Sequence, residues 1–156
     1  MNWKQLSVFL ENKPGALNEP CRLLARAGIN IHTFSLADTR EFGILRLVVA
    51  DSERARRLLE RNGFAVKLTQ VMMIEVPDQP GELARVLGAL EGTDISVKYA
   101  YGFTMEHKAK GVLVFCFDDP DRAIEVLQRH RINILATSKP RRRNRRARSA
   151  RRGQGS

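Results

Sequence analysis

Lys13-Pro14-Gly15-Ala16-Leu17 and Gln79-Pro80-Gly81-Glu82-Leu83 are two copies of one short pattern, with their prolines 66 residues apart in a chain of 156 residues. At the same offset, Ile29-Asn30-Ile31 aligns with Ile95-Ser96-Val97. An apolar, strand-like run precedes each copy. A repeat at a fixed offset predicts two copies of one structural unit.

We place the units at residues 1–69 and 70–138. In the first, Leu6, Val8 and Leu10 alternate as in a strand, and a helix follows the Pro-Gly turn and ends at Gly28. Further strands are expected at 29–37, 44–50 and 64–69, with a second helix after residue 51 or 52. The second unit repeats the order, with strands at 95–103, 111–117 and 132–136.

The order βαββαβ, found twice, predicts an α+β fold of two tandem ferredoxin-like units. Each unit has an antiparallel sheet with its helices on one face. We expect the other sheet face of each unit to pack on its counterpart, because it is apolar enough to need a partner.

The formal net charge of +10 is unevenly distributed along the chain. Residues 1–138 contain 18 Lys and Arg against all 17 Asp and Glu, whereas residues 140–156 contain eight arginines and no acid. The body can bury a core without disulfides or metals. The tail has no large apolar residue and repels itself. We therefore expect a folded body followed by a disordered Arg-rich tail over residues 139–156.

The Pro-Gly turn delivers the chain into a helix N-terminus, where unpaired backbone amides and the helix dipole suit a carboxylate. Proline fixes φ, and glycine adopts conformations that other residues resist. Asn12 stands at the strand end beside these donors, and its amide can accept from an ammonium and donate to a carboxylate. An amino-acid zwitterion needs both functions. A Pro-Gly turn is also a common strand-to-helix connection without any ligand.

These features resemble the ACT domain, in its tandem form. The resemblance rests on Asn12-Lys13-Pro14-Gly15-Ala16-Leu17 with Gly28-Ile29-Asn30-Ile31, and on Asp78-Gln79-Pro80-Gly81-Glu82-Leu83 with Asp94-Ile95-Ser96-Val97. It implies a regulatory module that binds a small ligand, most often an amino acid, and controls enzymes of amino-acid metabolism. Many ACT units bind nothing and only pair, so both readings stay open.

The resemblance also implies the candidate ligand-binding residues. In the first unit they are Asn12, Lys13, Pro14, Gly15, Ala16, Leu17, Asn30 and Ile31; in the second they are Asp78, Pro80, Gly81, Glu82, Leu83, Ser96 and Val97. In the family, the position of Asn30 often reaches a ligand held at the loop of a neighbouring unit. The resemblance therefore implies a homo-oligomer, which we expect to be a dimer. Serine-binding members often have a histidine where this chain has Leu10, which argues against serine.

Other chemistries find no support in the sequence. Cys21 and Cys116 lack ligand spacing and are expected to be reduced packing residues of a cytoplasmic protein. His32, His107 and His130 have no partner at metal-ligand spacing. Nucleophile motifs and Gly-rich phosphate loops are absent. We expect no metal, no cofactor, no catalysis and no membrane span.

Two alternatives remain at this stage. The stretch Leu6-Ser7-Val8-Phe9-Leu10-Glu11-Asn12 is also similar to the opening of acetolactate synthase small subunits, which would make the chain a regulatory subunit of such an enzyme. Those subunits have one N-terminal ACT unit and a different C-terminal half. The arginine tail can bind nucleic-acid phosphates without sequence preference, or it is a solvated extension that contacts acidic partners.

Overall fold

The computed structural model describes residues 3–39, 41–105 and 109–136. The first unit consists of β1 (Trp3–Glu11), α1 (Asn18–Arg26), β2 (Ile31–Asp38), β3 (Phe42–Val49), α2 (Ser52–Arg61) and the first half of β4 (Ala65–Pro77). The second unit uses the other half of β4, followed by α3 (Glu82–Gly88), β5 (Val97–Met105), β6 (Lys110–Phe117), α4 (Pro120–Arg129) and β7 (Asn133–Ile134). The predicted βαββαβ order is confirmed in both units.

Strand β4 joins the two units. Its N-terminal half pairs with β1, from Phe9 opposite Ala65 to Trp3 opposite Val71, and its C-terminal half pairs with β6. The strands follow the order β2-β3-β1-β4-β6-β5, with β7 also on β4, and all pairings are antiparallel. The expected junction between residues 69 and 70 falls inside this strand.

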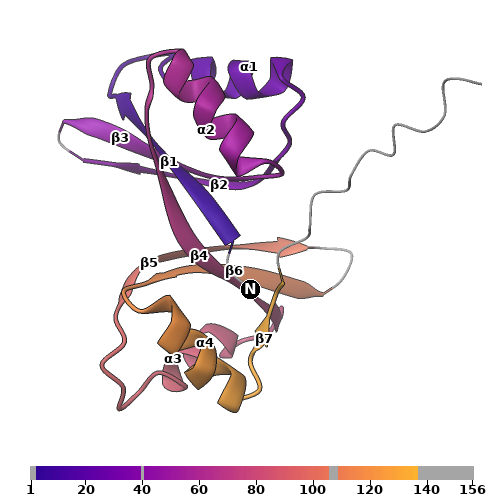
Figure 1. Cartoon of the computed structure of the whole chain (residues 1–156). Helices are drawn as coiled ribbons and strands as arrows, with labels where there is room; N and C mark the ends of the chain where they lie inside the picture. The colour runs from indigo at the N-terminus through magenta and orange to yellow at the C-terminus, as the bar shows by residue number, and fades with distance from the viewer. Residues whose placement is uncertain (1–2, 40, 106–108, 137–156) are drawn as a thin grey trace, which may run out of the picture.

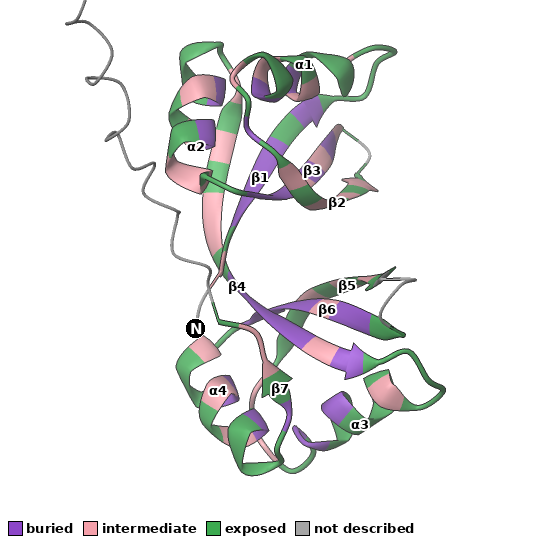
Figure 2. Cartoon of the chain, turned by 90° about the vertical axis from the view of Figure 1, so that its right-hand side faces the viewer, coloured by how far each residue is buried: buried purple, intermediate pink, exposed green. Residues whose placement is uncertain are grey.

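The molecule has four layers. Figure 1 shows α1 and α2 on the outside of one half-sheet, α3 and α4 on the outside of the other, and the two helix-free sheet faces turned toward each other. Figure 2 shows the buried positions gathered along the central strands and on the inner sides of the helices. The predicted arrangement, with helices on one face of each antiparallel sheet, is confirmed.

Each unit has its own core between sheet and helices. In the first, Leu6, Val8 and Leu45 pack against Leu24 of α1 and Leu59 of α2. In the second, Met72, Ile74 and Phe115 of the sheet pack with Val86 of α3 and Leu127 of α4.

A third apolar cluster lies between the helix-free faces of the two half-sheets. It joins Val48 and Trp3 of the first unit to second-unit residues that include Met73, Val114 and Tyr101. The Trp3 indole Nε1 donates to the Leu135 carbonyl at 3.1 Å. The expected packing of one unit's bare sheet face on the other is therefore confirmed.

The helices that follow the two Pro-Gly turns differ in how they begin and in how much apolar surface they leave exposed. Helix α1 begins at Asn18, and Leu17 is its N-cap with no side-chain capping bond. Pro20 falls in the first turn, where its missing N–H costs nothing. In α3, Val86 is buried, whereas Leu83 and Leu87 are 50% and 42% exposed. His107 and the tail at residues 139–156, both subjects of the sequence predictions, lie outside the described residues.

None of the described helices is long and apolar enough to cross a membrane.

Candidate functional site

The loop between β1 and α1 contains a glycine in the left-handed conformation. Gly15 has φ +81°, a conformation that residues with a Cβ resist. The Asn18 amide donates to the Gly15 carbonyl at 3.0 Å, and the Ala16 amide donates to the Lys13 carbonyl at 3.3 Å. The amides of Gly15 and Leu17 donate to no described residue, so two backbone donors remain at the start of α1.

Asn12 fixes the β2–β3 turn against this loop. Its Nδ2 donates to the Thr39 carbonyl at 3.0 Å. A Cβ added to Gly43 would stand 3.3 Å from Asn12 Oδ1, so the glycine makes room for the amide. Among the described residues no group donates to Oδ1, which leaves this oxygen available to accept a hydrogen bond.

A hollow of about 390 Å³ lies between the loop and the edge of the sheet. It is lined by Leu10, Glu11, Asn12, Lys13, Pro14, Ala16, Leu17, Leu36 and Gly43. Five of the candidate residues of the first unit therefore share one hollow, and Gly15 belongs to the same loop. Sequence reasoning missed Glu11, Leu36 and Gly43 as lining residues. Leu36 and Gly43 reach the hollow because the β2–β3 hairpin places them beside the loop. No local sequence pattern predicts this contact.

The hollow carries one ion pair at its mouth. Lys13 Nζ lies 2.6 Å from Glu11 Oε2, and both side chains are exposed. The hydrogen bond from Lys13, and then its charge, lower the pKa of the Glu11 carboxyl, and the same contact raises the pKa of Lys13. Both groups are therefore charged at neutral pH. Exposed pairs of this kind are worth little and exchange partners readily.

Asn30 and Ile31 stand apart from this hollow. They lie at the start of β2, whereas Leu36 lies near its end beside the β2–β3 turn. The Asn30 carbonyl accepts from the Ala50 amide at 3.1 Å, and its side chain is exposed. Within one chain, the structure does not bring Asn30 to the Asn12 loop.

The equivalent loop of the second unit is built differently. Gly81 is the left-handed N-cap of α3, with φ +91° and no side-chain capping bond. The Asp78 amide donates to the Ala109 carbonyl at 2.9 Å, and Glu82 pairs with Arg85 at 2.8 Å. At the repeat offset Gly102 stands where the first unit has Leu36, so the apolar wall is missing.

The remaining candidates of the second unit lie far from its Pro-Gly loop. Ser96 precedes β5, and its amide donates to Asp118 Oδ1 at 2.9 Å. This backbone hydrogen bond is the largest cause of the lowered pKa of Asp118. Ser96 and Val97 lie at the start of β5. The other end of β5 is the one near Asp78, because Met105 and Pro77 both pair with Lys110 of β6. Asn30 is likewise at the start of β2, away from the loop of the first unit. The structure therefore engages Ser96 in a turn within its own unit.

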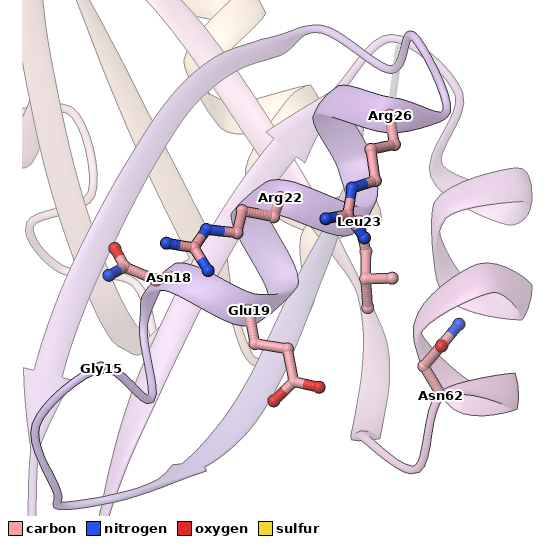
Figure 3. A pocket seen from close by; sticks show the side chains of 7 residues that line it. All are labelled: Gly15, Asn18, Glu19, Arg22, Leu23, Arg26 and Asn62. Atoms are coloured by element: carbon pink, nitrogen blue, oxygen red, sulfur yellow. The ribbon is translucent and has the colours of Figure 1, made fainter.

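A second hollow, of about 650 Å³, lies on the outer side of the first unit. Figure 3 shows Arg22 and Arg26 along α1, with Glu19 on the same helix and Asn62 at the end of α2. Its polar lining residues, Asn18, Glu19, Arg22, Arg26 and Asn62, are all exposed. Gly15 and Asn18 also line it, so it adjoins the back of the Pro-Gly loop.

The His, Cys, Asp and Glu side chains of the described residues are the groups from which a metal site or a reactive thiol would be built. Across residues 3–39, 41–105 and 109–136, no group of three or more His, Cys, Asp or Glu side chains could hold a metal ion. Cys21 and Cys116 are both free thiols, and burial raises the pKa of Cys21, which disfavours its reactive thiolate.

The family description "ACT domain pair" matches residues 1–141 of the chain. The chain therefore belongs to the ACT domain pair family, as the two Pro-Gly loops indicated. This match supports a regulatory, ligand-binding class of protein. Because it spans both units, it favours the tandem arrangement over the single-unit acetolactate synthase alternative.

Solved structures agree with the family match. Protein BT0572 from Bacteroides thetaiotaomicron is 39% identical, with a TM-score of 0.82, and the match covers 86% of this chain and 92% of that one. The regulatory subunits of aspartate kinase from Thermus thermophilus and Thermus flavus are 14% and 16% identical, with TM-scores of 0.60 and 0.61. Each match covers 83% of this chain, and 93% and 90% of those chains respectively, and shows likeness of fold. No curated protein matches the chain.

Proposed function

We propose that the chain is a non-catalytic regulatory protein that senses an amino acid with an aliphatic side chain, bound in the hollow of the first unit. The observation that carries the proposal is the composition of that hollow. One end has the unpaired backbone amide of Leu17 and a charged pair, and the walls are apolar. Ligand sites combine apolar walls with a few placed polar groups in this way.

The polar end suits a zwitterion. The Leu17 amide and the Lys13 ammonium offer donors to a carboxylate. Glu11 and the free Oδ1 of Asn12 offer acceptors to an ammonium. Because the Glu11–Lys13 pair is exposed, a ligand can exchange each partner for one of its own charged groups at little cost.

The walls favour an aliphatic side chain. Leu10 is buried, and Leu17 and Leu36 are 36% and 52% exposed. Gly43 also lines the hollow and has no side chain to fill it. A ligand that covers these leucines removes apolar surface from water, worth roughly 25 cal/mol for each Å². Beyond the Glu11–Lys13 pair at the mouth, no charged side chain lines the described hollow, so a charged ligand side chain would be left unpaired.

We further propose that a second copy of the chain completes this site. β2 is an edge strand with Phe34 62% exposed, and unpaired strand edges invite pairing. Antiparallel pairing of two β2 edges would bring Asn30 of one copy to the Leu36 end of the other, beside the hollow. Sedimentation should then give a dimer, and Phe34→Glu should give a monomer. A wild-type monomer at 100 μM would contradict this step.

A thermal-shift screen over the twenty amino acids tests the ligand proposal. At a ligand concentration 100 times the dissociation constant, binding stabilises the folded state by about 2.7 kcal/mol. Leucine, isoleucine, valine and methionine should raise the melting temperature, and aspartate and lysine should not. If none of the twenty shifts it at 10 mM, the proposal fails.

A matched pair of variants locates the site. Asn12→Ala removes the exposed acceptor of the first loop, and Asp78→Ala changes the equivalent position of the second. The shift caused by the best amino acid, measured against each variant's own ligand-free form, should fall in Asn12→Ala and persist in Asp78→Ala. The opposite pattern would move the site to the second unit.

A further inference from the structure

A polar cluster lies inside the apolar packing between the two half-sheets. Gln5 is fully buried and comes from β1, and its Nε2 donates to Tyr99 Oη at 2.8 Å and to Ser7 Oγ at 3.3 Å. Tyr101 Oη donates to Gln5 Oε1 at 2.7 Å. Arg46 of β3 stacks on the Tyr99 ring, with Cζ 3.9 Å from the centroid. We call Gln5, Ser7, Arg46, Tyr99 and Tyr101 the inter-sheet cluster.

The charge of Arg46 is uncompensated. Its Nε is buried and has no hydrogen-bond partner, and no described acid forms an ion pair with the guanidinium. A buried donor without a partner costs free energy, and a charged one costs more. Cation–π contact with Tyr99 offsets part of this cost but accepts no N–H hydrogen bond in the guanidinium plane.

The surroundings of Arg46 supply donors and no anion. Across the strands, its neighbours are Ser7 on β1 and Ser35 on β2, and Lys67 of β4 is next in the row after Ser7. Both hydrogens of Gln5 Nε2 are used, on Tyr99 and Ser7. This leaves the guanidinium N–H groups and the Ser7 hydroxyl hydrogen directed to no described acceptor.

We propose that this inter-sheet cluster is a binding site for a small carboxylate anion, with Arg46 as its charged ligand. A carboxylate has two oxygens in one plane and matches the edge of a guanidinium with two parallel hydrogen bonds. Arg46 is half-buried, with its Nε atom buried, and this one cation balances one negative charge, which favours a monoanion over a phosphate dianion. The Ser7 hydroxyl provides a third donor.

This site is independent of the amino-acid site proposed above. Arg46 lies on the helix-free face of the sheet, because its neighbours Leu45 and Leu47 belong to the core under the helices. Gly43 and Leu36, which line the hollow, pair with Leu10 and Leu45 and so lie on the helix-covered face. Acetate has no ammonium group, so a test with acetate does not depend on zwitterion binding.

The test titrates acetate, inorganic phosphate and chloride at constant ionic strength, with melting temperature and the fluorescence of Trp3 as readouts. Trp3 is the chain's single tryptophan and packs in the same inter-sheet contact. Acetate should bind saturably and more tightly than phosphate or chloride. Arg46→Met should weaken acetate binding at least tenfold, and Lys67→Met, the control on the same row, less than twofold.

Three outcomes would overturn the proposal. They are no saturable acetate binding up to 100 mM, unchanged binding by Arg46→Met, and equal weakening by Lys67→Met. Tighter phosphate than acetate binding would overturn the carboxylate assignment. If Arg46→Met does not fold, Arg46→Lys takes its place, because it keeps the charge and loses the planar fork. It should still weaken acetate binding severalfold, and wild-type affinity in that variant would contradict the site.

Discussion

Replacing Gln5 by methionine should loosen the contact between the two units. The change keeps the length and most of the volume of the side chain but removes three hydrogen bonds, to Ser7, Tyr99 and Tyr101. Each bond contributes about 1 kcal/mol, and hydroxyls left unpaired cost about 1–3 kcal/mol each when fully buried. Both tyrosines are only partly buried, so water recovers some of that cost. We expect a loss of about 2–3 kcal/mol in the free energy of unfolding.

Urea unfolding followed by Trp3 fluorescence measures this loss, because Trp3 packs across the same contact. The midpoint should fall while the denaturant slope stays constant. Adding Tyr101→Phe to Gln5→Met removes the second partner, so the double variant should lose less than the sum of the two single losses. A loss below about 0.5 kcal/mol for Gln5→Met, or strictly additive losses, would refute the account of this contact.

Three further predictions concern stability. Gly15→Ala should cost about 1–2 kcal/mol in urea unfolding through backbone strain alone, since φ is +81° and nothing lies within 4 Å of the added Cβ; no loss would mean that the loop changes conformation. Asp51→Ala and Asp119→Ala each remove an N-cap hydrogen bond of 3.1 Å, to α2 and α4, and each should cost about 1 kcal/mol by the same assay. Burial raises the pKa of Tyr99 and Tyr101 above the ordinary value of 10.0, so their contribution to stability should be complete below about pH 10 and be lost as pH rises further. Urea midpoints from pH 8 to 11 should show this fall, and it should be shallower in the double Tyr→Phe variant.

The repeat and its turns made the fold predictable from the sequence. The offset between Pro14 and Pro80, together with the strand and helix periodicities, predicted the element order of both units. Caps were also predictable where the side chain does the capping, as at Asp119 with Pro120 in the first turn of α4. These features are local, so they depend on residues that are adjacent in the sequence.

The packing between the units could not be predicted in the same way. Gln5 has the polar character of an outward strand position, yet it is fully buried because the second half-sheet covers it. β4 runs without a break through Ala65–Pro77. The sequence indicates this only because the stretch contains no Gly, Asn or Asp that would favour a turn. Arg46 carries no sequence signal at all, since its setting arises from the second unit.

The candidate site shows the same division. The Pro-Gly loop and Asn12 could be predicted from the motif, because their chemistry lies in consecutive residues. Leu36 and Gly43 could not, because they reach the hollow through the β2–β3 hairpin. Asn30 was implied as a ligand residue by family resemblance, and its distance from the loop within one chain is the reason for our proposal that a second copy completes the site.

An NMR titration tests the central claim most directly. Leucine added to the ¹⁵N-labelled protein should shift the amide signal of Leu17 most, because this donor is proposed to bind its carboxylate. The amides of Gly81 and Leu83, at the equivalent loop, should stay nearly constant. Shifts confined to the second loop, or no shifts with any aliphatic amino acid at 10 mM, would contradict the account.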